Sequence, residues 1–254
     1  MNTKICINSN YSDNAALVAF VNNIDEEMNR GGELLFSGRN TVKRFVINGF
    51  DEPIVVKRFR KPNALNSLIY GNLRTSKAKR AYENAFELIA RGFFTPTPFA
   101  YVEQRHCGRM GYCFFLTSEC CDDHIGSKLS PPIYDTTIAD AFAEFVAQLH
   151  TKGVLHYDLN STNVLYNIDN GKISFSLIDI NRMKFFRSGS EMPMRDAFEN
   201  LTLFTGEKDI FTYVATKYVE CRGLPKSFVD KALEQKRRHD RSYTRRKKFS
   251  RMFK

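Results

Sequence analysis

Three polar residues in the second half of the chain, Asp158, Asn163 and Asp179, constrain the fold more than any other feature. Asp158 and Asn163 lie five residues apart in the run HYDLNSTNVL, residues 156–165. Asp179 follows 21 residues after Asp158, behind what the pattern predicts to be a short β-hairpin. We therefore expect one tight loop and the start of the next segment to present these side chains together. The alternative is a surface turn at Asp158 and an unrelated aspartate at a strand end.

This order and spacing are typical of sites that transfer phosphate. Phosphoryl transfer depends on positioning and charge neutralisation more than on covalent chemistry. We expect Asp158 to be the catalytic residue, because its carboxylate would orient a substrate hydroxyl or accept its proton. Asn163 and Asp179 are predicted to hold Mg²⁺, which combines a few hard oxygen ligands with water and phosphate. ATP and Mg²⁺ are therefore the predicted cofactors.

Two charged residues in the first half fit the same chemistry. Lys57 lies in a strand-like run behind a predicted hairpin, and we expect it to bind the phosphates of ATP. Arg58 would then point to the opposite face of that strand. Glu83, in a predicted helix over residues 75–91, is expected to pair with Lys57. Glu87, one turn further on, is the alternative partner, and both Lys57 and Glu83 could instead be ordinary solvated residues.

Two further segments are predicted to contact the nucleotide. The loop over residues 37–41 carries one glycine, Gly38, where protein kinases have Gly-x-Gly-x-x-Gly. Backbone amides near Gly38 could approach phosphate, and Arg39 could supply charge; the alternative is an ordinary strand turn. Glu119 and Cys121 follow the last predicted strand of the first half, and we expect their backbone carbonyl and amide groups to bind adenine.

Hydrophobic periodicity predicts a strand-rich first half and a helix-rich second half. The expected elements of the first half are a helix from a Ser12 cap to about Met28, ended by Gly31-Gly32, the helix over 75–91, and strands over 33–37, 42–47, 53–59, 99–103 and 111–117, with a turn at Asn48-Gly49. The second half is expected to contain helices over 136–152, 194–204, 207–222 and 225–240, and a hairpin of strands 164–166 and 173–177 around Asp169-Asn170-Gly171.

These elements predict an α+β chain with a two-lobed protein-kinase-like fold. The antiparallel-sheet N-lobe would occupy residues 1–118 and the mainly helical C-lobe residues 119–254. A length of 254 residues suits one large domain or two small lobes that share a cleft.

The positive charge of the chain is concentrated at its C-terminal end. Residues 236–254 hold ten basic side chains and one acid, Asp240, and so carry +9 of the net charge of +10. Three interpretations of this basic tail from about Lys236 stay open. It could bind an anionic membrane or glycolipid surface, where each basic residue contributes ~1 kcal/mol. It could bind RNA through phosphate contacts, or it could be a solvated tail.

Cysteine usage and hydropathy indicate a cytoplasmic protein. None of the six cysteines, at 6, 107, 113, 120, 121 and 221, forms a Cys-x-x-Cys pair, so we expect reduced structural thiols and no zinc site. No apolar run approaches the ~18 residues of a membrane-spanning helix. Residues 1–10 lack the basic start and apolar stretch of a signal peptide.

Six stretches carry a family resemblance. They are residues 37–40, 55–57, 77–83, 95–98, the Asp158 loop and 179–185. On these residues the chain resembles the lipopolysaccharide kinase (Kdo/WaaP) family of the protein-kinase-like superfamily, over about residues 31–225. The resemblance implies use of ATP and Mg²⁺, a sugar hydroxyl of the lipopolysaccharide inner core as acceptor, and work at the cytoplasmic face of a Gram-negative inner membrane.

Departures from protein kinases favour a small or glycolipid acceptor. Tyr157 replaces the arginine of His-Arg-Asp, which normally binds a phosphate on the activation loop, so control by such phosphorylation is not expected. Asn160 replaces the lysine that many protein kinases place two residues after the catalytic aspartate, so Lys57 or Arg39 would have to compensate at the γ-phosphate. The segment after Asp179 is short and lacks an Ala-Pro-Glu anchor.

Two alternative functions differ in class from a sugar kinase. One is a small atypical protein kinase or ATPase, similar to the RIO or tRNA-modification-complex kinases, whose basic tail would bind RNA. The other is a non-catalytic nucleotide-binding scaffold. The presence of Lys57, Asp158, Asn163 and Asp179 together argues against the scaffold, because a degenerate site usually loses one of them.

Overall fold

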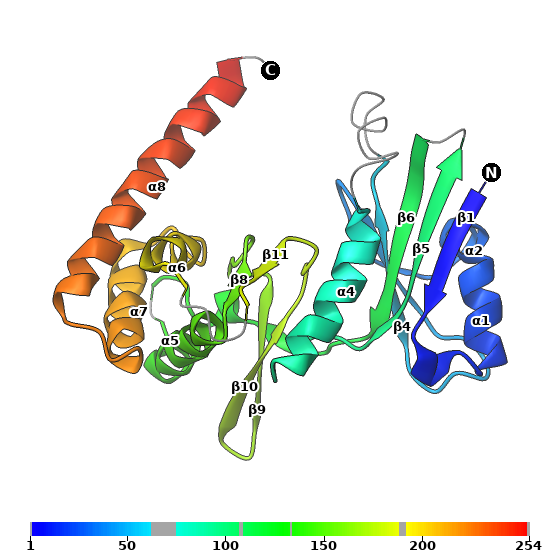
Figure 1. The fold of residues 1–254 in the computed structure, drawn as a ribbon, viewed down its shortest axis with the longest axis horizontal. Coiled ribbons are helices and arrows are strands. Elements are labelled where there is room, and N and C mark those ends of the chain that lie inside the picture. Colours follow the sequence, from blue (N-terminus) through cyan, green and yellow to red (C-terminus); the bar gives the residue numbers. More distant parts are fainter. Residues whose placement is uncertain (1, 62–74, 107–108, 133, 188–191, 253–254) are drawn as a thin grey trace. The chain divides into compact units, whose positions relative to one another are not determined.

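The chain folds into two compact units, Met1–Cys121 and Asp122–Lys254. The computed structural model describes residues 2–61, 75–106, 109–132, 134–187 and 192–252. The first unit is built on an antiparallel sheet and the second is mainly helical (Figure 1). The strand-rich and helix-rich halves predicted from periodicity are therefore confirmed.

The first unit contains one six-stranded antiparallel sheet. Its strands, in spatial order, are β1 (Asn2–Ile7), β5 (Pro98–His106), β6 (Arg109–Ser118), β4 (Ile54–Phe59), β3 (Thr41–Phe45) and β2 (Glu33–Ser37). Five of the six strands were predicted. β1 was not, because nothing local distinguishes an N-terminal edge strand whose pairing partner β5 lies far along the chain, where Ile7 pairs with Ala100 and Asn2 with Arg105. The connection at Asn48-Gly49 spans residues 46–53 and is longer than a two-residue turn.

Two short helices, α1 (Ala15–Asn22) and α2 (Ile24–Arg30), replace the single helix that was expected. The N-cap is Asn14, whose side-chain oxygen accepts a hydrogen bond from the amide of Leu17 at 2.8 Å. The prediction of Ser12 as the cap was wrong, because the Ser12 hydroxyl donates to the carbonyl of Ser9 and closes the preceding 3-10 turn. Asn23 interrupts the helix between α1 and α2.

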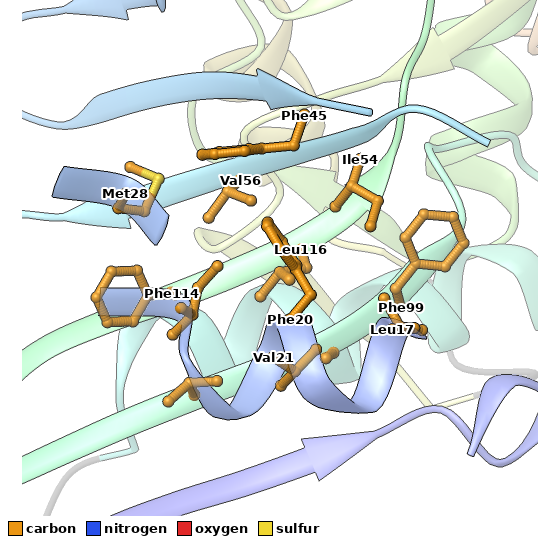
Figure 2. Packing of buried hydrophobic residues seen from close by; sticks show 13 residues of the cluster. Leu17, Phe20, Val21, Met28, Phe45, Ile54, Val56, Phe99, Phe114 and Leu116 are labelled. Carbon is orange, nitrogen blue, oxygen red and sulfur yellow. The ribbon is translucent and has the colours of Figure 1, made fainter. Parts of the chain in front are cut away.

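The apolar side of α1 and α2 buries one face of the sheet. Figure 2 shows Leu17, Phe20 and Val21 of α1 pointing at the strand residues of this core, among them Val56 and Phe114. Each fully buried side chain of this size contributes roughly 1.5–3 kcal/mol. The core therefore determines which residues of β4 face inward, and the intervening residues of β4 point to the other face of the sheet.

The helix α4 (Lys77–Ala90) packs on that other face. The Tyr82 ring of α4 meets the Tyr101 ring of β5 in an edge-to-face contact with centroids 5.2 Å apart. Tyr101 lies between Ala100 and Val102, which both belong to the core under α1 and α2. The sheet is thus covered by helices on both faces, and α4 shares its face with the odd-numbered residues of β4.

The described residues of the second unit form four α-helices, a short 3-10 helix (Ile125–Ser127) and two small sheets. The helices are α5 (Thr136–Thr151), α6 (Met194–Leu201), α7 (Lys208–Cys221) and α8 (Ser227–Met252). One sheet has the order β10 (Lys172–Leu177), β9 (Val164–Asp169) and β7 (Asp123–His124), and the other pairs β11 (Met183–Phe185) with β8 (Val154–His156). The predicted hairpin is confirmed, with Asn170 and Gly171 both at positive φ, 49° and 76°. α8 continues to Met252 and not to residue 240 as expected.

The described elements also bear on the predictions about membrane-spanning helices and cysteines. No helix in the described ranges combines the length and the apolar character needed to cross a membrane. Cys113 is buried in β6, and burial raises the pKa of its thiol to about 11, which suits a structural thiol. Cys107 lies outside the described residues.

Candidate active site

The segment between β8 and β9 forms a tight loop around Asp158. The amide of Leu159 donates to the carbonyl of His156 at 3.0 Å, and the amide of Asn160 donates to the carbonyl of Asp158 at 2.7 Å. The side-chain oxygen of Asn160 accepts from both the amide and the hydroxyl of Thr162, at 3.0 and 2.6 Å. Such local side-chain bonds stabilise turns built on asparagine. The loop is therefore held largely by its own residues.

Asn160 also contacts the predicted catalytic carboxylate. Its Nδ2 donates to Oδ1 of Asp158 at 3.3 Å. The residue that stands where many protein kinases have lysine thus supplies a neutral donor to the carboxylate. The Asp-x-Asn-x-Thr spacing was a local signal for this turn.

His156 links the Asp158 loop to the Asp179 segment. Its Nδ1 accepts the amide of Asp158 at 3.1 Å, and its Nε2 donates to the carbonyl of Ile178 at 2.9 Å. This pairing requires the neutral ring with the proton on Nε2. Burial lowers the pKa of His156, against smaller opposing effects of the Ile178 carbonyl and of Asp158 and Asp179. The ring is therefore an uncharged connector between the two segments.

Asn163 makes the second link. Its Nδ2 donates to the carbonyl of Asp158 at 2.8 Å, and its own backbone carbonyl accepts the amide of Ile178 at 3.0 Å. Because Nδ2 donates in this bond, Oδ1 is the side-chain atom of Asn163 that could contact a cation. The structure thus joins Asp158 and Asn163 in one hydrogen-bonded network that extends to Ile178, the residue directly before Asp179.

Asp179 has a left-handed backbone conformation, with φ of 53°. For a residue other than glycine, this conformation costs about 1–2 kcal/mol. The residue before it, Ile178, has both its backbone amide and its backbone carbonyl hydrogen bonded. Oδ1 of Asp179 accepts a hydrogen bond from the side-chain amide of Asn181. Strained residues that the surrounding structure holds in place cluster at functional sites. Nothing in the sequence pattern predicted this conformation.

Asn163 and Asp179 suit Mg²⁺ better than a softer metal. Their donor set is one amide oxygen and one carboxylate, and Mg²⁺ commonly takes one or two such ligands with water and phosphate. Across the described ranges, no group of three or more histidine, cysteine or acidic side chains could hold a metal by itself. The residues present therefore fit a hard cation that shares its shell with phosphate.

A chain of buried polar side chains supports the loop from below. Nδ2 of Asn200 donates to the carbonyl of His156 at 2.7 Å, and Oδ1 of Asn200 accepts from Nε2 of His150 at 3.0 Å. The hydroxyl of Tyr218 then donates to Nδ1 of His150 at 2.8 Å and accepts from Nη1 of Arg222 at 2.8 Å. Burial lowers the pKa of His150 to about 4. These contacts join α5, α6 and α7. Apart from the bond of Arg222 to Tyr218, they span 44 to 68 residues and so left no local signal.

Lys57 of β4 points to the face of the sheet that carries α4. It lies opposite Phe115 of β6, and its Nζ is 5.5 Å from the ring centroid of Phe59. Arg58 points to the other face, where its Nη1 donates to Oδ1 of Asn29 in α2 at 2.8 Å. The expected opposite directions of Lys57 and Arg58 are therefore confirmed.

Glu83 is exposed on α4 and forms an ion pair with Lys79, one turn earlier on the same helix, at 3.4 Å. The rival Glu87 pairs with Arg91 at 2.7 Å. Exposed pairs of this kind contribute roughly 0–1 kcal/mol and exchange readily. The pairing of Glu83 with Lys57 stays a prediction.

Gly38 and Arg39 lie in the exposed turn between β2 and β3. The amide of Gly38 donates to the carbonyl of Asn40 at 3.1 Å. A Cβ at residue 38 would come within 2.9 Å of the ring of Phe36, so glycine allows this ring to lie over the turn. The guanidinium of Arg39 is exposed at the tip.

Glu119 and Cys121 lie at the end of the first unit, after β6. The carboxylate of Glu119 accepts from Nε of Arg44 at 2.8 Å, and its amide donates to the carbonyl of Pro53 at 3.2 Å. These bonds hold the segment after β6 against the residues beside β3 and β4. Cys121 is exposed.

Comparisons with known proteins address the fold and the family. The family described as "Lipopolysaccharide kinase (Kdo/WaaP) family" matches residues 65–196. A structure titled "WaaP in complex with acyl carrier protein" is similar with a TM-score of 0.60 and 15% identity, covering 92% of this chain and 97% of that one. A structure of the Rio2 kinase-ADP/Mg²⁺-phosphoaspartate complex from Chaetomium thermophilum is similar with a TM-score of 0.46 and 14% identity, covering 84% of this chain and 71% of that one. No curated protein sequence matches. The similarity to WaaP confirms the predicted two-lobed protein-kinase-like fold.

Proposed function

Because the chain belongs to the lipopolysaccharide kinase (Kdo/WaaP) family, we propose that it transfers the γ-phosphate of ATP to a sugar hydroxyl of the lipopolysaccharide inner core. The observation that carries this proposal is the hydrogen-bonded network that joins Asp158, Asn163 and the Asp179 segment through His156. The reaction would take place at the cytoplasmic face of the inner membrane, where ATP is available.

Asp158 is the proposed catalytic residue. Its Oδ1 accepts a hydrogen bond from Asn160, which orients the carboxylate and leaves Oδ2 to receive the acceptor hydroxyl. The carboxylate would align the hydroxyl oxygen with the γ-phosphorus and take its proton as the new P–O bond forms, while the bond from the γ-phosphorus to the β–γ bridging oxygen breaks and releases ADP. A neutral Asn160 donor restrains Asp158 without neutralising its charge, so it can still accept a proton.

Asn163 and Asp179 are the proposed ligands of Mg²⁺. When bound, Mg²⁺ would neutralise negative charge on the phosphates of ATP. Asn163 would contribute its side-chain oxygen, because its Nδ2 is bonded to the carbonyl of Asp158. Asp179 would contribute its carboxylate, whose Oδ1 also accepts the side-chain amide of Asn181. The connector His156 would hold the Asp158 loop beside the Asp179 segment, because its ring bonds to the amide of Asp158 and to the carbonyl of Ile178, the residue before Asp179.

The first unit would supply the remaining nucleotide contacts. Lys57 is proposed to bind phosphate oxygens, with Glu83 as its ion-pair partner when nucleotide is bound. Backbone amides at Gly38 and the charge of Arg39 would cover the phosphates, and the backbone groups of Glu119 and Cys121 would bind adenine. Lys57 and Arg39 would also replace the γ-phosphate lysine that this chain lacks at Asn160.

A small or lipid-linked acceptor is part of the proposal. Tyr157 is 46% exposed and its amide donates to the carbonyl of Arg182 at 2.9 Å. A tyrosine cannot bind a phosphorylated activation loop as the arginine of His-Arg-Asp does. The enzyme would therefore be active without such phosphorylation, and it would need no platform for a protein substrate.

The test is phosphate transfer from labelled ATP to purified core glycolipid. Asp158→Asn keeps the shape of the side chain but removes the carboxylate, and we expect transfer to fall by roughly 100-fold or more. Asp169→Asn, in the exposed β9–β10 turn, is the matched control and should retain full transfer. Circular dichroism would establish that both variants are folded.

Unchanged transfer by Asp158→Asn would overturn the assigned role. Autophosphorylation or RNA-stimulated ATP turnover, with no transfer to glycolipid, would instead support an atypical protein kinase or ATPase. The first outcome tests the role of Asp158 in phosphate transfer, and the second tests whether the acceptor is a glycolipid.

A further inference from the structure

The C-terminal half of α8 extends beyond the body of the second unit. The N-terminal half of α8 packs against α6 and α7, where Ala232 is fully buried. From residue 241 to 249 every side chain is exposed, and Figure 1 shows this part of the helix projecting beyond α6 and α7. At 1.5 Å per residue, the exposed part of the helix is on the order of 15 Å long.

Lys236 anchors α8 and sets its rotation about its own axis. Only 5% of Lys236 is exposed. Its Nζ donates to the carbonyls of Thr205 at 2.7 Å and Thr202 at 3.4 Å and to Oδ1 of Asp240 at 2.7 Å. The expectation that the basic tail begins at Lys236 was therefore wrong, because this lysine belongs to the body.

Four basic residues beyond the anchor form a stripe along one face of α8. We define the basic stripe as Arg237, Arg241, Arg245 and Lys248, which follow each other at helical spacings of four, four and three residues. At 3.6 residues per turn they span about 80° of the helix surface, and the stripe is centred about 160° from the Ala232–Lys236 side. It therefore faces away from the body.

The basic stripe has no acidic partner in the described part of the chain. All four side chains are exposed, and none of the ion pairs between described residues involves them. Their neighbour Arg238, by contrast, pairs with Glu234. Like charges four residues apart repel on a helix. A column of such charges therefore destabilises the isolated helix and favours an anionic partner.

We propose that the basic stripe docks α8 on an anionic lipid surface, through the phosphates of the headgroups. The inference rests on the proposed function, because the acceptor of that reaction is an anionic glycolipid held in a membrane. Juxtamembrane basic clusters are attracted to such surfaces in just this way. Phe249, 65% exposed and about 40° from Arg245, lies where an aromatic ring could enter the headgroup region.

The position of Tyr243 favours lipid over single-stranded nucleic acid. Nucleic-acid surfaces of that kind alternate basic residues with aromatic side chains on which bases stack. Tyr243, however, lies on the body side of the helix and stacks on His239, with centroids 6.4 Å apart. The exposed half of α8 also has no continuous apolar face, so we expect adsorption by charge and not burial in the acyl chains.

The experiment is co-sedimentation of the full chain with vesicles of phosphatidylcholine, with and without phosphatidylglycerol. Arg241→Gln/Arg245→Gln removes two charges from the stripe. Arg246→Gln/Lys247→Gln removes the same charge from adjacent exposed positions that point away from the stripe. We expect the stripe variant to bind phosphatidylglycerol vesicles roughly 30-fold more weakly, and the control less than about threefold. Binding of the wild-type chain should fall as salt rises.

If the two double variants lost vesicle binding equally, the proposed role of the basic stripe would be rejected, because binding would then depend on total charge alone. Binding that does not depend on phosphatidylglycerol would overturn an anionic surface. Tighter binding to RNA than to the charged vesicles, lost in the stripe variant, would assign the stripe to nucleic acid and reject the proposal.

A second measurement separates this inference from the proposed function. Both double variants should phosphorylate a delipidated, water-soluble core oligosaccharide as fast as the wild-type chain. Weak vesicle binding with intact transfer to this acceptor supports the stripe. Failure of the wild-type chain to phosphorylate any core acceptor would reject the proposed function, whatever the vesicles show.

Discussion

The backbone amide of Asp158 donates a hydrogen bond to Nδ1 of His156 at 3.1 Å. The same ring donates from Nε2 to the carbonyl of Ile178, directly before Asp179. One buried imidazole therefore joins the two segments that carry the proposed base and the proposed metal ligand. The arrangement works only while the ring is neutral, because a protonated Nδ1 cannot accept the amide of Asp158.

Replacing the connector should impair turnover more than nucleotide binding. His156→Phe fills the same space but leaves the amide of Asp158 and the carbonyl of Ile178 without partners, at a cost of about 1–3 kcal/mol for each buried group. A displaced Asp158 should lower kcat by roughly 100-fold, with a smaller change in the KM for ATP. Steady-state kinetics would measure both. His124→Phe, at an exposed site in β7, is the control. Unchanged kcat would mean that the loop keeps its shape without the ring.

His150 should make the protein less stable in mild acid. Burial lowers its folded-state pKa to about 4, whereas the unfolded chain titrates near 6.5. Below pH 6.5 the unfolded state therefore binds a proton that the folded state does not, so the stabilisation present at higher pH is lost as the pH falls toward 4. Between pH 6.5 and 5 the expected loss from His150 alone is about 2 kcal/mol.

Urea unfolding of the wild-type chain and of His150→Gln at a series of pH values would check this. The variant lacks the titrating ring and should show a shallower pH dependence, although it is less stable at pH 7. Parallel curves for the two proteins would contradict a neutral, buried His150.

Loss of the Lys236 anchor should loosen α8. Lys236→Met keeps most of the apolar stem but removes the ammonium that bonds to Thr205 and Asp240. Hydrogen bonds that involve a charged group contribute about 1.5–3 kcal/mol, so Tm should fall by several degrees. Lys248→Met makes the same change at an exposed position of the same helix. Calorimetry would compare the two, and equal Tm values would show that Lys236 does not anchor the helix.

Removing the proposed metal ligand should separate ATP binding from its dependence on Mg²⁺. A ligand that binds the folded chain raises Tm with its concentration. We expect ATP with Mg²⁺ to raise the Tm of the wild-type chain more than ATP with EDTA. In Asp179→Asn the two conditions should give the same Tm. A full Mg²⁺ effect in the variant would remove Asp179 from the metal site, and Asn181→Ala would then test its neighbour.

Much of the candidate site could be predicted because its contacts are local. The bonds of Asn160 to Asp158 and Thr162 span two residues, and the bond of Asn163 to Asp158 spans five. Such contacts depend on neighbouring residues alone, so residue type and spacing reveal them. The hairpin after this loop was predictable for the same reason, since Asn170 and Gly171 readily adopt the positive φ that its turn requires.

Contacts between distant segments could not be predicted in this way. Asn200 reaches His156 across 44 residues, and Tyr218 reaches His150 across 68. β1 pairs with β5, and Ser12 gives way to Asn14 as the cap because the side chain of Asn14 also reaches the carbonyl of Gly49. These choices depend on which chain segments meet.

Residue order therefore accounts for the chemistry of the Asp158 loop, the alternation that sends Lys57 and Arg58 to opposite faces, and the charge of the C-terminal segment. Packing accounts for the neutral state of His156, the strained backbone of Asp179, and the separation of buried Lys236 from the exposed basic stripe. The physical reason is burial. Desolvation and the cost of unpaired polar groups act only after distant segments have come together, and they then select one protonation state, one backbone conformation and one helix rotation.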